Sequence, residues 1–462
     1  MKTVRRLYFY AVALISLEVV LWGSINLLRS IIDQTVGGGA EALASALALI
    51  LVGMPIFLFH WQWTQRVSAR DAEEKTASLR AIFLYSVLIG TLIPVVENLL
   101  ALINRNSLEV AHVARSTAIV GGSQTLADNI IAIAINGIVA LYFWNITRGD
   151  WKTLPVKEDW ADVRRLYRYI WVLYSLIMVV FGVQQILYYL FYVPSGILGE
   201  VGHGTFINGL ALLIVGTPVW FYSWRVIQAS IADAAERESN LRLGVLYLLA
   251  LGGVITVMTT AALFLDIVIR KLLGADISTS DFIQQIGGPI SIGVPLGAVW
   301  AYYGYWLNRH IESIGDAVRQ SGMKHVYYYV LSILGLGAAF TGVALLIKFM
   351  IDIQTGGLIM SDPLRSQLAS AISLIIAWLP LWLGTWIPME AQAMMKNDIG
   401  DHARCSNIRK AYLYLALFAG VIGGMTAAVA LVFELLKALF IGQTDSSFLS
   451  TILNDLQLFV LF

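Results

Sequence analysis

The chain carries little charge, a single cysteine and no recognisable catalytic motif. Only 13% of its 462 residues are charged, whereas soluble globular domains have roughly a quarter. With Cys405 alone, no intrachain disulfide can form. The formal net charge is +1, which gives no reason to expect nucleic acid as a partner. These absences argue against a soluble enzyme, a disulfide-stapled secreted domain and a nucleic-acid-binding protein.

The histidines do not form a ligand set. No two of them have metal-binding spacing on one helix, and none falls in the middle of an apolar segment, where a haem would need an axial ligand. Phosphate loops, dinucleotide fingerprints and nucleophile motifs are also missing. We therefore expect no metal, no cofactor and no enzymatic activity. The histidines are His60, His112, His203, His310, His325 and His402.

Long apolar runs dominate the sequence. Hydrophobic residues make up 58% of the chain, the mean hydropathy is +0.73, and many runs reach about 20 residues, the length that spans a bilayer. The pattern predicts an all-α integral membrane protein with two alternating helix types. The first type (A) opens with basic residues and tyrosines, near 7–32, 80–104, 165–192, 242–273, 325–353 and 409–441. The second type (B) ends in tryptophan and a charged stretch, near 42–65, 125–147, 205–228, 283–308, 365–389 and from 448 onward.

The sequence repeats itself. VRRLYFY at 4–10 returns as VRRLYRY at 163–169, so the first helix is an ordinary member of the repeat and not a signal peptide. ALILVGMPIFLFHW at 48–61 returns as ALLIVGTPVWFYSW at 211–224. Such periods predict three modules of four helices. Because four is even, successive modules enter the membrane in the same direction, as parallel repeats. We place the modules at 1–162, 163–322 and 323–462, and we expect the last helix of the third to be cut short.

The basic residues are distributed asymmetrically. Of the 31 Lys and Arg residues, 23 lie at the N-terminus and in the connections that lead from B to A helices, and 8 lie on the opposite side. Cytoplasmic loops carry an excess of Lys and Arg. The sequence therefore predicts a cytoplasmic N-terminus and cytoplasmic long loops. The recurring tryptophans at the B-helix ends fit a membrane–water boundary.

Two acidic residues fall inside predicted spans. Glu18 lies near mid-depth in the first A helix, and Glu97 lies further along the second. Ionisable groups inside a bilayer are costly and often functional. The functional interpretation is a proton or cation site; the structural one is a protonated acid hydrogen-bonded to a neighbouring helix. Ile177 takes the place of Glu18 in the second module, which favours the structural interpretation.

A polar patch lies late in the third A helix. It contains Gln184 and Gln185, next to Tyr188 and Tyr189. Such side chains line cavities or hydrogen-bond to neighbouring helices within membranes. The second interpretation is favoured.

Two further features have alternative interpretations. The prolines Pro55, Pro218 and Pro380 either mark broken helices that bind ions or kink the B helices for packing. Recurrence in several modules favours packing. The charged connections 67–80 and 226–242 are either solvated linkers or amphipathic extensions of the B helices, and the linker interpretation is favoured.

The basic-tyrosine opening, the glycine-rich A helix and the VGxPxxxxxW ending of B together resemble a family of bacterial polytopic membrane domains of unknown function, built from tandem two-helix units. The resemblance covers nearly the whole chain and is clearest at Val4–Arg66 and Val163–Trp224. It implies a protein of the bacterial inner membrane. It carries over no catalytic residue.

Three functions are compatible with these features. The first is a non-enzymatic scaffold or accessory subunit of a membrane complex, with the lipid bilayer and other membrane subunits as partners. The second is a transporter or channel that uses Glu18 and Glu97. An intramembrane enzyme has the least support. A hydrated path lined by Glu18 favours transport, and a dry core favours scaffolding.

Overall fold

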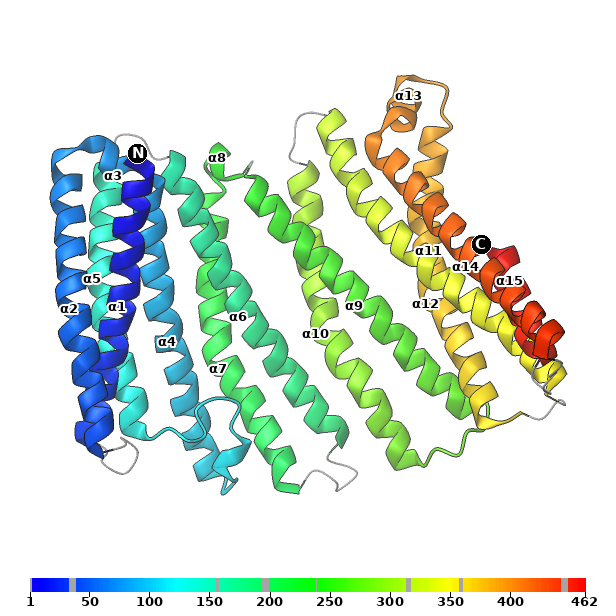
Figure 1. The fold of residues 1–462 in the computed structure, drawn as a ribbon, viewed down its shortest axis with the longest axis horizontal. Helices are drawn as coiled ribbons and strands as arrows, with labels where there is room; N and C mark the ends of the chain where they lie inside the picture. The colour runs from blue at the N-terminus through cyan, green and yellow to red at the C-terminus, as the bar shows by residue number, and fades with distance from the viewer. Residues whose placement is uncertain are drawn as a thin grey trace. The chain divides into compact units, whose positions relative to one another are not determined.

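The computed structural model describes residues 2–32, 39–154, 158–192, 199–237, 239–312, 317–356, 360–441 and 448–462. Within these ranges the chain is almost entirely helical and has no strand (Figure 1). Eleven of the described helices are long and apolar enough to cross a membrane. The predicted all-α polytopic membrane class is therefore confirmed.

All twelve predicted helices are present, and most are longer than the apolar stretch from which each was predicted. The A-type helices are α1 (Lys2–Ile32), α4 (Ser78–Val110), α6 (Glu158–Tyr192), α9 (Asn240–Leu272), α11 (Ala317–Thr355) and α14 (Asn407–Ile441). The B-type helices are α2 (Gly39–Arg70), α5 (Leu126–Thr153), α7 (Gly199–Ser230), α10 (Thr279–Glu312), α12 (Asp362–Ala393) and the short α15 (Phe448–Leu461). Short helices complete the set: α3 (Ala72–Thr76), η1 (Arg115–Thr117), α8 (Ala234–Arg237) and α13 (Asp398–Cys405).

The B helices continue through their prolines. Pro55, Pro218 and Pro380 each lie inside an uninterrupted helix. The freed carbonyl group of each is thus accommodated without breaking the helix. The broken-helix interpretation of these prolines is not supported.

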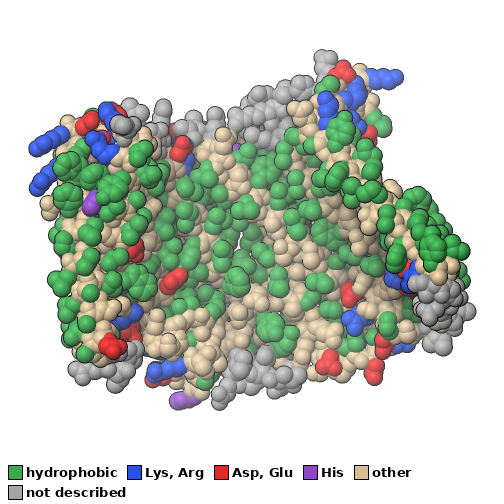
Figure 2. Space-filling view, in the orientation of Figure 1, with side chains coloured by type: hydrophobic (Ala, Val, Ile, Leu, Met, Phe, Trp, Pro, Cys, Tyr) green, Lys and Arg blue, Asp and Glu red, His purple; other side chains and the backbone are tan. Residues whose placement is uncertain are grey.

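The chain forms two compact units. Unit 1 comprises Met1–Tyr189 and Ile197–Leu241, and unit 2 comprises Leu190–Gly196 and Arg242–Phe462. Unit 1 thus contains the helices from α1 to α8, apart from the last residues of α6. Unit 2 contains nearly all of α9 and the helices that follow it. Figure 2 shows hydrophobic side chains along the lengths of the helices and blue basic groups mostly near their ends.

An aromatic trio is the clearest sign of the repeat inside each core. In unit 1, Trp61 lies 5.4 Å from Phe83, and Tyr10 lies 5.2 Å from the same ring, measured between centroids. The trio in unit 2 is Tyr329, Trp386 and Tyr412, with Trp386 stacked on Tyr412 at 5.0 Å. Trp61 is buried. At the positions of Trp61 and Trp224, both buried, the recurring tryptophan therefore packs into the core.

A glycine in each module lets its first two helices approach closely. A Cβ atom on any of the three would lie about 3 Å from a backbone carbonyl oxygen of the next helix, tighter than ordinary contacts. Small residues allow this approach in membrane helix pairs. The glycine–carbonyl pairs are Gly23 with Ala46 at 3.2 Å, Gly182 with Gly209 at 3.0 Å and Gly342 with Ala371 at 3.1 Å.

Candidate functional site

The paired arginines of the repeated opening motif bind a glutamate in the following short helix. In α1, Arg5 and Arg6 donate to the buried Glu74 of α3 at 2.7 and 2.8 Å. In α6, Arg164 and Arg165 donate to the buried Glu236 of α8 at 3.1 and 3.0 Å. A buried carboxylate is stable there because two cations face it. The charged connections are therefore partly folded, and each is tied to the start of an A helix.

The neighbouring Glu73 is exposed and makes a weaker contact. Lys2 donates to it at 2.8 Å and Arg6 at 2.9 Å. The hydrogen bond from Lys2, followed by that from Arg6, lowers the pKa of Glu73 from its ordinary value. Water and salt screen this exposed group.

The third module has a different contact at this place in the repeat. His325, in the place of Arg6 and Arg165, has its Nε2 2.9 Å from Oε1 of Gln392. Gln392 lies in the long helix α12 and not in the short helix α13, so the start of this A helix is attached to a different element.

A second buried cation begins α4. Arg80 contacts Asp150 at the end of α5 at 2.7 Å, and it also donates to Ser68 at 3.0 Å and to Gln65 at 3.2 Å. Its repeat equivalent Arg409 binds Glu390 of α12 at 3.0 Å. These charges have the partners that burial requires, so they hold helices together. Sequence reasoning missed them, although DAEEKTASLR at 71–80 aligns with DAAERESNLR at 233–242.

The opposite helix ends in unit 1 are joined by buried amides. Asn104 of α4 donates to Asn208 of α7 at 2.7 Å, and Asn208 donates to the carbonyl of Thr117 at 2.8 Å. Asn129 of α5 donates to Asn98 of α4 at 3.1 Å. Such interhelical hydrogen bonds stabilise membrane bundles. No sequence pattern singled out these residues.

The structure does not join Glu18 and Glu97 into one site. Glu18 is half-buried against α4, so close that a Cβ atom on Gly90 would lie 2.7 Å from its Oε1. It has no hydrogen bond to a described residue. Glu97 lies seven residues beyond Gly90 on α4, about 10 Å along the helix axis, and is exposed. The proton-site and structural interpretations of Glu18 both stay open.

Gln184 and Gln185 are half-buried in α6. The Cβ of Gln185 packs close to Gly209 of α7. Neither side chain has a hydrogen bond to a described residue. The adjacent Tyr189 does contact α7, with its hydroxyl 3.3 Å from Nδ1 of His203. The predicted polar patch therefore lies at a helix–helix contact.

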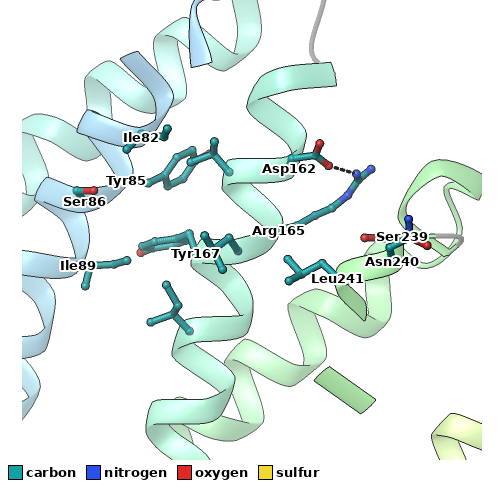
Figure 3. A pocket seen from close by; sticks show the side chains of 13 residues that line it. Ile82, Tyr85, Ser86, Ile89, Asp162, Arg165, Tyr167, Ser239, Asn240 and Leu241 are labelled. Carbon is teal, nitrogen blue, oxygen red and sulfur yellow. Dashed lines mark hydrogen bonds and ion pairs between the residues drawn. The ribbon is translucent and has the colours of Figure 1, made fainter. Parts of the chain in front are cut away.

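Two cavities flank the contact between α4 and α6 in unit 1. The first has a volume of about 700 Å³ and is lined by residues such as Ile82, Ser86, Asp162 and Arg165. Figure 3 shows Tyr85 and Tyr167 between the two helices, with the Asp162–Arg165 pair at the rim. The ring centroids of Tyr85 and Tyr167 are 5.0 Å apart. Both tyrosines also line the second cavity, so they separate the two.

The second cavity has a volume of about 630 Å³ and lies among α4, α5, α6 and α7. Its walls are mainly apolar, and two arginines, Arg164 and Arg168, line it. Glu18 lines neither cavity. Among the described residues, no group of three or more His, Cys, Asp or Glu side chains is placed to hold a metal ion. The two cavities therefore present apolar surface next to cationic side chains.

These features define a polytopic helical membrane protein built from tandem repeats. The sequence profile of the domain of unknown function DUF5671 matches residues 6–138, 165–298 and 325–462. The chain therefore belongs to the DUF5671 family and contains its domain three times, as the resemblance implied. No curated protein and no solved structure gives a significant match.

Proposed function

We propose that this chain is a non-enzymatic scaffold or accessory subunit of a bacterial membrane complex. In this proposal it resides in the inner membrane with its N-terminus in the cytoplasm, as the distribution of Lys and Arg favours. The paired charges and amides described above support it, because they link helices to one another. A bundle held together by such contacts suits a binding platform.

The observation that carries the proposal is the exposure of α14. Only 6% of its most apolar stretch is buried, compared with 17–44% in the ten other long helices. Large side chains remain uncovered on more than one face, including Leu417, Phe418 and Val421. A helix that is apolar all round is usually buried among other helices or in lipid. In this proposal a transmembrane helix of a partner subunit packs against α14.

Photo-cross-linking in the native membrane tests the proposal. A cross-linking amino acid replaces Leu417 on α14, and the matched control replaces Leu51 on α2, which is 71% exposed. We expect a discrete protein adduct from position 417 that also co-purifies with the uncross-linked chain in mild detergent. Position 51 is expected to give lipid adducts. Lipid adducts alone at both positions, with a purified chain free of other subunits, would overturn the proposal.

The alternative is a transporter or channel. One observation favours it: the Glu18 carboxyl lies inside a predicted span and has no hydrogen bond to a described residue. An unpaired acid at such depth is a candidate proton or cation group. The position of Glu18 outside both cavities weighs against a hydrated path through it.

A further inference from the structure

The second cavity combines a long apolar lining with cationic groups at one end. Leu88, Leu92 and Val96 line it along α4, and Leu141 adds to it from α5. Arg164 and Arg168 line it near the start of α6. Its volume of about 630 Å³ falls within the range of small-molecule sites, roughly 300–1,000 Å³.

The two arginines differ in their partners. Arg164 binds Glu236 at 3.1 Å and lies 3.7 Å over the ring of Trp151. Glu236 also forms an ion pair with Arg165, so two arginines share this carboxylate. Arg168 is half-buried and makes no hydrogen bond or ion pair with a described residue, and its Nη1 atom is buried without a partner. Glu236, which two other arginines share, acts on it only at longer range. A buried cationic atom without a hydrogen-bond partner is costly, and an anion in the cavity would remove that cost.

The first module carries aromatic rings at the equivalent positions of its helices. The repeated motifs VRRLYFY and VRRLYRY differ only in Phe9 and Arg168. Phe9 stacks on Trp63 with centroids 5.8 Å apart, and it lies 5.3 Å from His60. At the shift that aligns α2 with α7, Trp63 corresponds to Val226 and His60 to Ser223.

All three aromatic groups are thus replaced in the second module by smaller or charged side chains. Arg168, Ser223 and Val226 all line the cavity. The first and second copies therefore differ at these three positions, although their opening motifs are otherwise identical. This difference points to a role for the second copy beyond packing.

We propose that this cavity binds an anionic phospholipid, with an acyl chain between α4 and α7 and the phosphate on Arg168. The cavity follows α4 from Tyr85 to Val96, about 16 Å of helix, which suits an extended chain. A guanidinium group binds phosphate through directed, charge-assisted hydrogen bonds. This lipid site does not depend on the scaffold proposal, because it lies in unit 1 and not on α14.

Lipid retention by the purified full-length chain tests the site. The chain is reconstituted with phosphatidylglycerol or phosphatidylcholine and examined by native mass spectrometry after release from the membrane mimetic. We expect retained phosphatidylglycerol in the wild type and roughly tenfold weaker retention in Arg168→Gln, since a charge-assisted hydrogen bond is lost. Val226→Trp leaves Arg168 intact but fills the cavity, and it should reduce retention as well.

The matched control is Arg225→Gln, which removes an exposed charge near the same end of α7 without touching the cavity. It should retain lipid like the wild type. A thermal-shift measurement with inorganic phosphate alone separates a lipid from a free anion. Wild-type retention by Arg168→Gln, equal retention of phosphatidylcholine, or full stabilisation by inorganic phosphate would each overturn the proposal.

Discussion

Arg80 and Asp150 form an ion pair at 2.7 Å that fastens the start of α4 to the end of α5. Both residues are buried, and Arg80 is 1% exposed. Removing the Asp150 carboxylate leaves Arg80 buried with only neutral hydrogen-bond partners. We expect Asp150→Asn to lower the free energy of unfolding by about 3–5 kcal/mol. Unfolding in mixed detergent micelles measures this, and the exposed Arg148→Gln serves as the control with little change. Equal stability of both variants would contradict the assigned role of the pair.

The adjacent Glu73 and Glu74 provide a matched test of burial. Glu74→Gln should destabilise the fold by about 3 kcal/mol, because Arg5 and Arg6 lose a buried partner. Glu73→Gln should have almost no effect in physiological salt, since Glu73 and its partner Lys2 are both exposed to water.

The lowered pKa of Glu73 also gives a pH dependence. A carboxyl whose pKa is lower in the folded state stabilises the fold above its unfolded pKa, and this contribution disappears as the pH falls through the folded pKa. In low salt, the stability difference between wild type and Glu73→Gln should therefore shrink below about pH 4. A difference that grows on acidification would show that the contact is not electrostatic.

Gly182 allows α6 and α7 to approach. A Cβ atom there would lie 3.0 Å from the carbonyl oxygen of Gly209 and 2.9 Å from Leu213. Gly182→Ala should therefore cost about 1–3 kcal/mol through overpacking. Gly149→Ala is the control: nothing lies within 4 Å, and alanine favours helix by about 1 kcal/mol. Opposite signs of the two changes in detergent unfolding are the expected result.

Glu18 distinguishes the two functional classes. We expect no proton- or sodium-driven flux in proteoliposomes of the wild type, and little loss of stability in Glu18→Gln, because the amide keeps a donor and an acceptor. Stability and flux are measured on the same preparations. Flux that disappears in Glu18→Gln would establish the transporter in place of the scaffold.

The orientation is tested by cysteine labelling in a Cys405→Ser background. Arg70 at the end of α2 and Ser116 in η1 are both exposed and lie at opposite ends of α4. With a cytoplasmic N-terminus, Arg70→Cys should resist impermeant thiol reagents in intact cells and react after permeabilisation. Ser116→Cys should react in both. The reverse pattern would invert the assigned topology.

The helices were predictable from sequence because a long apolar run is almost enough by itself to predict a membrane-spanning helix. The structure places Gly23 and Gly182 of the glycine-rich A helices at equivalent contacts, in agreement with the repeat. The ion pairs were not predicted, since Arg80 and Asp150 are 70 residues apart and only tertiary packing joins them. The second cavity escaped prediction for another reason. It arises from side-chain volume missing beside Arg168, which a single helix sequence does not reveal.

The contact between His325 and Gln392 joins the start of α11 to the long helix α12. In the first two copies, the arginines at the same place in the repeat join the start of the A helix to the short helix α3 or α8, through Glu74 or Glu236. Deleting α3 or α8 should therefore release the start of α1 or α6, whereas deleting α13 should leave this attachment of α11 intact.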